Sequence, residues 1–112
     1  MEPDHHMLLD RCARAQQAAQ RLLDETLHAL RQLLNAGAAG GADEASALQR
    51  EQARAHGVAW AATYVHALQQ MLGWAQRLQR GGRFGELEAL LLQAAYAEYL
   101  AQLAGGLPMS QG

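Results

Sequence analysis

A glutamate and a histidine three residues apart form the pair in this sequence that most suggests metal chemistry. Glu25 and His28 stand in a Glu-x-x-His pattern, and residues three apart share one helix face, as the ligands of bundle di-iron sites do. Such sites need a second copy of the pattern and two further glutamates; Glu2 and His5 have the same spacing but lie at the N-terminus, where we expect the chain to fray. We favour a solvated helix face, with a metal site across a dimer axis as the alternative.

The single cysteine of the chain, Cys12, cannot form an internal disulfide. It follows Leu8 by four residues and precedes Ala15 by three, so it falls on an apolar helix face, where we expect a buried, inert thiol rather than a nucleophile. A chain without disulfides needs no oxidising compartment, and we therefore predict a cytoplasmic protein.

The remaining histidines and arginines favour structural roles. His56 and His66 are ten residues apart, roughly 15 Å along a helix, so they cannot share a metal ion. Arg77, Arg80 and Arg83 surround a glycine pair, where they are expected to cap a helix and pair with acids; contact with an anionic ligand is the alternative. No Gly-x-Gly-x-x-Gly, phosphate loop or Gly-x-Ser-x-Gly is present. The residues therefore indicate no catalytic, cofactor-binding or metal site.

The composition predicts an all-α protein. Ala, Leu and Gln, all good helix formers, make up half of the 112 residues, while Ile is absent and Val occurs twice. The net charge of −2, with acids and arginines mixed, lacks the basic face that nucleic-acid binding requires. No stretch of 18 apolar residues is free of charge, so no membrane span is expected.

Glycine clusters separate three segments of helical periodicity, which predicts an antiparallel bundle of three helices. We expect helices at about 4–35, 43–80 and 85–104, a Gly/Ala-rich loop at 36–42 and the start of a linker at 105–112.

Two glycines lie inside the second expected helix. Gly57 and Gly73 each cost about 1 kcal/mol relative to alanine there. We predict a continuous helix in which close approach of a neighbouring helix explains the glycines, with a kink at Gly57 as the alternative.

The second and third expected helices are apolar on most of their circumference, more than a three-helix monomer can bury. Self-association, or docking on another domain, would cover the excess; the alternative is that these side chains fill the core of the bundle. The predicted interaction surface comprises Trp60, Tyr64, Met71, Trp74, Leu78, Leu92, Tyr96, Tyr99 and Leu103.

Three stretches carry a family resemblance: residues 57–65, residues 83–86 and residues 98–112. Over about 51–112 the chain resembles the N-terminal helical region of bacterial acyl-CoA dehydrogenases, which precedes a flavin-binding body; residues 1–50 show no match. The resemblance implies a parent enzyme that oxidises an acyl-CoA thioester with FAD. In that family the catalytic glutamate and the FAD contacts lie in later domains, so the resemblance assigns no catalytic residue here and implies that this part alone binds no cofactor.

These observations together predict one helical-bundle domain over 1–112, the N-terminal part of a longer chain. Its expected role is assembly or regulation of an acyl-CoA dehydrogenase-like flavoenzyme through apolar helix docking. The expected partner is a second copy or the flavoenzyme body. A stand-alone helical interaction module and, with less support, a metal-binding bundle enzyme are the alternatives.

Overall fold

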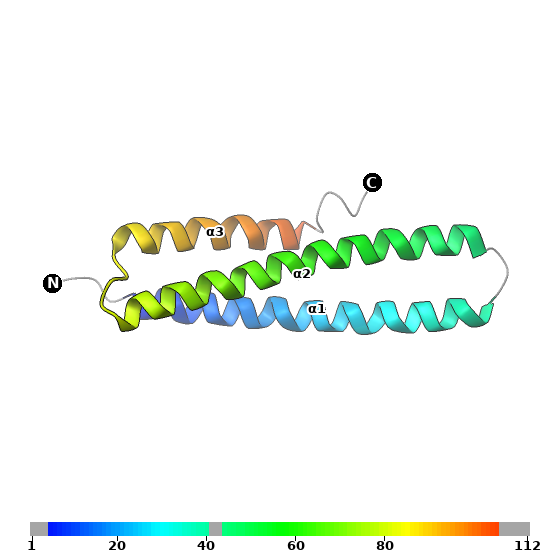
Figure 1. The fold of residues 1–112 in the computed structure, drawn as a ribbon, viewed down its shortest axis with the longest axis horizontal. Coiled ribbons are helices and arrows are strands. Elements are labelled where there is room, and N and C mark those ends of the chain that lie inside the picture. The colour runs from blue at the N-terminus through cyan, green and yellow to red at the C-terminus, as the bar shows by residue number, and fades with distance from the viewer. Residues whose placement is uncertain (1–4, 41–43, 106–112) are drawn as a thin grey trace.

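The computed structural model describes residues 5–40 and 44–105 of the chain, with side chains at 5–36 and 49–105. Over these ranges it contains three helices: α1 (His6–Gly40), α2 (Glu44–Arg80) and α3 (Glu86–Ala104). The helices run up, down and up in an elongated bundle of 67 × 22 × 16 Å (Figure 1). The prediction of an all-α, three-helix antiparallel bundle is confirmed.

The first helix ends five residues later than the sequence predicted. α1 continues through Gly37 to Gly40, although the expected end was Asn35. Three of the five added residues are alanine, the strongest helix former, and a glycine weakens a helix without forbidding it. Five of the seven residues of the expected loop at 36–42 are therefore helical, and residues 41–43 lie outside the described part.

α2 is the central helix of the bundle. It runs from Glu44 to Arg80 as one helix, so the predicted continuity through Gly57 is confirmed. It packs along α1 over most of its length and along α3 over its second half, while α1 and α3 touch each other little. The most deeply buried positions of α2 are Leu68 and Ala75, both at 0% exposure.

The core combines one face of each helix. Its buried members are Leu9, Cys12, Ala19 and Leu23 of α1, Val65, Leu68, Leu72 and Ala75 of α2, Phe84 of the turn, and Ala89, Leu92 and Tyr96 of α3.

A tight turn closes α2 and fixes the start of α3. The N–H of Arg83 donates to the carbonyl of Leu78 at 2.8 Å, and the N–H of Gly82 donates to the carbonyl of Gln79 at 3.1 Å. These two bonds define a Schellman motif, and Gly82 adopts the left-handed conformation (φ 71°) that the motif requires. The N–H of Gly85 then donates to Glu88 Oε1 at 3.1 Å, which caps α3.

Unequal helix lengths leave one end of the molecule thinner than the other. At about 1.5 Å per residue, the 35 residues of α1 span roughly 52 Å and the 19 residues of α3 roughly 28 Å. The half of the α1–α2 hairpin nearer Gly40 and Glu44 is therefore not covered by α3 (Figure 1).

Candidate docking surface

The residues that suggested metal chemistry lie on the surface of the bundle. Glu25 and His28 are both exposed on α1. Within the described ranges, no three His, Cys, Asp or Glu residues gather closely enough to hold a metal ion. His66 is exposed on α2.

Cys12 lies in the core at 5% exposure, which confirms the predicted buried thiol. Burial raises the pKa of the Cys12 thiol, so the reactive thiolate is disfavoured near neutral pH.

Three arginines flank the turn after α2. Arg77 and Arg80 lie in the last turn of α2, where positive charge interacts favourably with the helix dipole. The ion pairs among the described side chains are Arg14–Asp10 and Arg54–Glu51, both at 2.9 Å. The expected pairing of the turn arginines with acids is therefore not found.

A close approach of another helix was predicted at Gly73. A Cβ added there would meet Arg77 Nη1, which belongs to the same helix, at 3.4 Å, and no atom of another described helix within 4 Å. The predicted close approach is therefore wrong at that glycine.

A buried hydrogen bond ties α3 to α2. The Tyr96 hydroxyl donates to the Leu68 carbonyl at 2.7 Å, and Tyr96 is only 4% exposed. Burial raises the pKa of the Tyr96 hydroxyl, and the neighbouring Cys12 thiolate raises that pKa further. Tyr96 is thus the polar anchor of an otherwise apolar contact.

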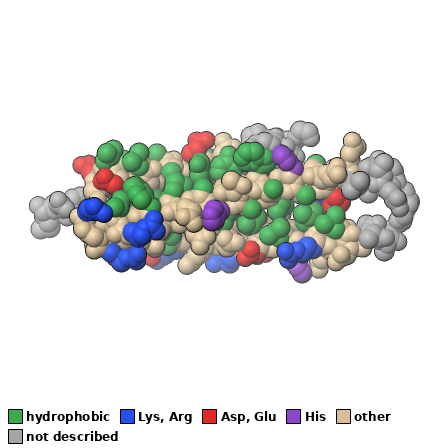
Figure 2. Space-filling model, in the orientation of Figure 1, with side chains coloured by type: hydrophobic (Ala, Val, Ile, Leu, Met, Phe, Trp, Pro, Cys, Tyr) green, Lys and Arg blue, Asp and Glu red, His purple; other side chains and the backbone are tan. Residues whose placement is uncertain are grey.

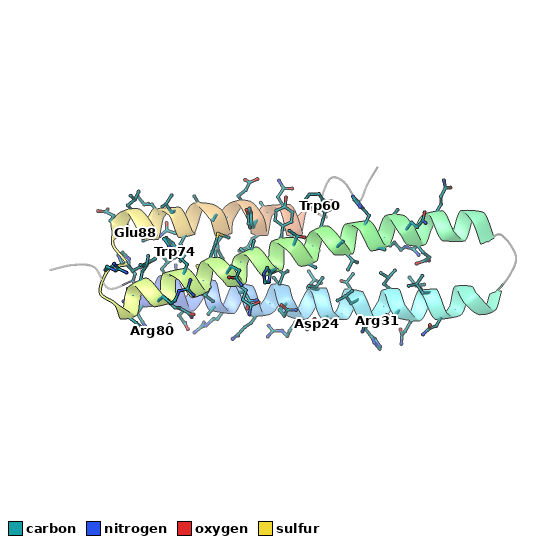
Figure 3. All side chains as sticks on the ribbon, viewed as in Figure 1. Asp24, Arg31, Trp60, Trp74, Arg80 and Glu88 are labelled. Atoms are coloured by element: carbon teal, nitrogen blue, oxygen red, sulfur yellow. The ribbon has the colours of Figure 1, made fainter. Side chains whose placement is uncertain are left out.

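An aromatic row runs along α2 toward α3. Trp60 Nε1 donates to His56 Nε2 at 3.0 Å. The rings of Trp60 and Tyr64 lie 6.3 Å apart, and those of Tyr64 and Tyr99 lie 4.9 Å apart in a T-shaped arrangement. Figure 3 shows Trp60 near the end of α3 and Trp74 near its start, so the two indoles mark opposite ends of the α2–α3 contact.

The predicted interaction surface divides between core and exterior. Leu92 and Tyr96 are buried, at 1% and 4% exposure, while Trp60 is exposed at 38%. The other members are partly buried: Tyr64, Met71, Trp74, Leu78, Tyr99 and Leu103. All of these except Tyr64 pack against the core. Most of the set is therefore at least partly buried within one copy, and its role as an interaction surface stays a prediction.

Three large apolar side chains of α3 that were not in the predicted interaction surface are exposed. Leu87, Leu90 and Leu91 project from α3 with 64%, 56% and 54% exposure. With the exposed Ala94, Ala97 and Ala101 they make up what we call the α3 outer face. Figure 2 shows hydrophobic side chains gathered along α3 and between α1 and α2 on the visible side of the molecule. The sequence predicted that the third helix is apolar on most of its circumference, and this pattern is what could have indicated the α3 outer face.

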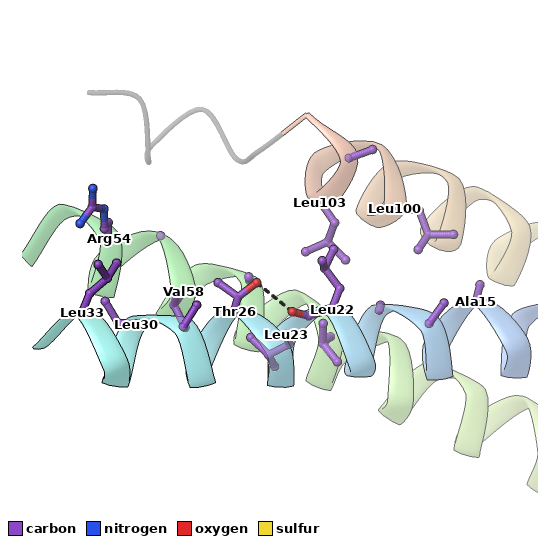
Figure 4. A pocket seen from close by; sticks show the side chains of 17 residues that line it. Ala15, Leu22, Leu23, Thr26, Leu30, Leu33, Arg54, Val58, Leu100 and Leu103 are labelled. Carbon is purple, nitrogen blue, oxygen red and sulfur yellow. Dashed lines mark hydrogen bonds between the residues drawn. The ribbon is translucent and has the colours of Figure 1, made fainter. Parts of the chain in front are cut away.

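An apolar groove opens where α3 stops covering the α1–α2 hairpin. The groove has a volume of about 710 Å³, and we call it the α1–α2 groove (Figure 4). It is lined by Ala15, Ala18, Ala19, Leu22, Leu23, Thr26, Ala29, Leu30 and Leu33 of α1, Arg54, Gly57, Val58, Ala61 and Val65 of α2, and Leu100, Leu103 and Ala104 of α3.

Thr26 and Arg54, the polar side chains that line the groove, each have a hydrogen-bond partner. Thr26 Oγ1 donates to the carbonyl of Leu22 at 2.8 Å, so its hydroxyl needs no water. Arg54 lies at the Leu33 end of the groove, where its Nη1 donates to Glu51 Oε1 at 2.9 Å. An apolar surface could therefore cover the groove floor without leaving a polar group unpaired.

Comparison with known proteins confirms the similarity to acyl-CoA dehydrogenases. Over 71 residues, 63% of its length, the chain is 58% identical to (2S)-methylsuccinyl-CoA dehydrogenase from Cereibacter sphaeroides. The chain spans 13% of that relative's length. Neither a protein-family model nor a solved structure matches the chain.

The similarity reaches further upstream than the sequence motifs indicated. The span from Glu51 to Gly112 holds 62 residues, so a match of 71 residues begins at least nine residues before Glu51. The similarity therefore includes part of the region ahead of Glu51, which was expected to show no match.

In the described parts of the three helices, no segment is long and apolar enough to cross a lipid bilayer.

Proposed function

We propose that this chain is a helical assembly domain of an acyl-CoA dehydrogenase-like flavoenzyme and acts by apolar helix docking. The similarity to (2S)-methylsuccinyl-CoA dehydrogenase supports the class of enzyme. The single observation that carries the assembly role is the apolar surface left uncovered by the three helices, which includes Leu22, Leu33, Leu87, Leu90 and Leu91 at 44% to 64% exposure. Exposed apolar patches of this kind mark interaction surfaces.

The α1–α2 groove does not fit the flavin that the proposed parent enzyme would use. FAD carries a pyrophosphate, which needs backbone N–H groups or cationic side chains directed at it. Arg54 is the cation at the groove, and it lies at one end, paired with Glu51. We therefore assign flavin binding and oxidation of the acyl-CoA thioester to the rest of the parent enzyme, and derive no catalytic step for this domain.

A deletion and a chimera of the relative test the proposal. The stretch of (2S)-methylsuccinyl-CoA dehydrogenase that matches this chain is deleted in one variant and replaced by the corresponding residues of this chain in another. We expect the deletion to lower the assembly mass in analytical ultracentrifugation while the flavin absorbance per subunit is kept, and we expect the chimera to restore that mass. Unchanged mass after deletion refutes an assembly role, and a change in turnover alone indicates regulation instead.

A further inference from the structure

We propose that two copies of this chain form a two-fold dimer in which the α3 outer face of each copy lies in the α1–α2 groove of the other. This inference rests on the proposed assembly function and names its contact surface and partner. It accounts for two apolar surfaces at once, because each covers the other.

The groove and the helix have the same length. The lining residues of α1 run from Ala15 to Leu33, which is 19 residues, and α3 from Glu86 to Ala104 is also 19 residues. Both correspond to roughly 28 Å of helix. A copy of α3 therefore matches the groove in length and would lie beside the end of the resident α3, whose Leu100, Leu103 and Ala104 form part of the lining.

The side chains of the two surfaces are complementary in size. The α3 outer face presents three large side chains, Leu87, Leu90 and Leu91. Small residues of both long helices line the groove, among them Ala18, Ala29, Gly57 and Ala61. Large side chains opposite small ones allow two helices to approach and interdigitate, and Gly57 offers the closest approach because it has no side chain.

A two-fold axis perpendicular to the bundle sets the direction of the inserted helix, and the charges agree with that direction. Within one copy α3 runs parallel to α1 (Figure 1), so a two-fold axis perpendicular to the bundle sets the second α3 antiparallel to α1. The first turn of that α3, which carries Glu86 and Glu88, then lies at the Leu33 end of the groove. Arg54 lies at the same end, and its guanidinium has donors left besides the one bonded to Glu51.

The contact is large enough for a weak dimer. A helix of about 28 Å length and 10 Å width covers on the order of 300 Å² of its partner. Each copy contributes one groove and one outer face, so the dimer buries on the order of 1,200 Å², the lower edge of specific interfaces. We therefore expect a dissociation constant in the micromolar range.

Neighbouring leucines provide a matched test of the groove. Leu33 and Leu34 are almost equally exposed, at 44% and 45%, but only Leu33 lines the groove. Sedimentation equilibrium of the 112-residue chain from 1 to 500 µM should show a monomer–dimer equilibrium. Leu33→Glu and Leu90→Glu should each raise the dissociation constant at least 100-fold, and Leu34→Glu should change it less than threefold.

A charge exchange tests the direction of insertion. Arg54→Glu and Glu86→Arg should each weaken the dimer about threefold, as expected for an exposed ion pair, and the double variant should recover the original affinity. Loss of the Arg54–Glu51 pair alone would not be rescued by a change at Glu86. This exchange also decides the question if circular dichroism shows that Leu33→Glu has lost helix.

The following results would overturn the dimer. They are a monomer at every concentration, an open series of larger assemblies, equal effects of Leu33→Glu and Leu34→Glu, or no rescue in the double variant. A chain that stays monomeric while its chimera still restores assembly of the flavoenzyme would refute the dimer and leave the proposed function standing. The groove would then receive a helix of the flavoenzyme body. Failure of both experiments would refute the proposed function as well.

Discussion

Replacement of Tyr96 by phenylalanine isolates the buried hydroxyl that joins α3 to α2. The ring keeps its place in the core, and only the 2.7 Å bond to the Leu68 carbonyl is lost. That carbonyl lies inside α2, so it keeps its place in the helical hydrogen-bond pattern. A net hydrogen bond contributes about 1 kcal/mol. We therefore expect Tyr96→Phe to lower the free energy of unfolding by about 1 kcal/mol at pH 7.

The same hydroxyl makes the difference in the free energy of unfolding between the wild type and Tyr96→Phe depend on pH. The pKa of Tyr96 in the folded chain lies above the value of about 10 that an unfolded tyrosine has, because burial and the Cys12 thiolate disfavour the phenolate. The stabilisation from the raised pKa is complete below about pH 10 and is lost as the pH rises further, since the unfolded chain then releases the proton first. At pH 11 the loss is about 1.4 kcal/mol, from 1.36 kcal/mol per pH unit. Tyr96→Phe has no such loss.

The hydrogen bond of Tyr96 stabilises the wild type, and the raised pKa of Tyr96 destabilises it at high pH. The order of stability of the wild type and Tyr96→Phe should therefore reverse as the pH rises. The wild type should be more stable by about 1 kcal/mol at pH 7 and less stable by about 0.4 kcal/mol at pH 11, with equality between pH 10 and pH 11. Urea unfolding followed by circular dichroism at both pH values measures the difference. Both proteins should carry Cys12→Ala, which removes the titration of the thiol and leaves burial, the larger cause, to raise the pKa of Tyr96. A difference that stays near 1 kcal/mol at pH 11 would show that the phenol ionises freely in the folded chain and would refute the reasoning.

Three further stability predictions follow from single contacts, each measured by the urea midpoint. Leu92→Ala, at a position 1% exposed, should cost about 2 to 5 kcal/mol, whereas Leu91→Ala at 54% exposure should stay within about 0.5 kcal/mol; equal effects would contradict the observed orientation of α3. Gly82→Ala places a side chain at φ 71° and should cost about 1 kcal/mol, while Gly81→Ala, whose Cβ would meet Arg77 O at 3.6 Å, should cost less. Glu88→Ala removes the acceptor for the Gly85 N–H and should cost about 1 kcal/mol, with Glu86→Ala, which lacks that bond, as the control.

The sequence predicted the helices well because their ends have strong local signals. Gly81 and Gly82 stop α2 through a motif that needs a left-handed residue, and the predicted last residue, Arg80, is the observed one. The end of α1 was misplaced since its glycines alternate with alanines, which support the helix through Gly40.

The docking surface was harder to predict, because a helix that is apolar all round gives no indication of which face is inside. On α3 the buried face is set by Tyr96, because its hydroxyl needs a buried hydrogen-bond acceptor. With Tyr96 inside, Leu92 points inward and Leu90 outward. The groove could have been inferred from the predicted lengths alone, since a third helix at 85–104 is too short to cover a hairpin of the length expected from 4–35 and 43–80.

The shorter α3 also sets a gradient of local stability along the molecule. Near Phe84, whose ring lies 5.3 Å from that of His5 and 6.3 Å from that of Trp74, the residues just before α1 and α3 pack with α2. Toward Leu33 and Arg54 only two helices support each other, so opening fluctuations require less energy there. Amide protons at that end should exchange with deuterium sooner than those around Leu68, and occupancy of the groove should slow them most.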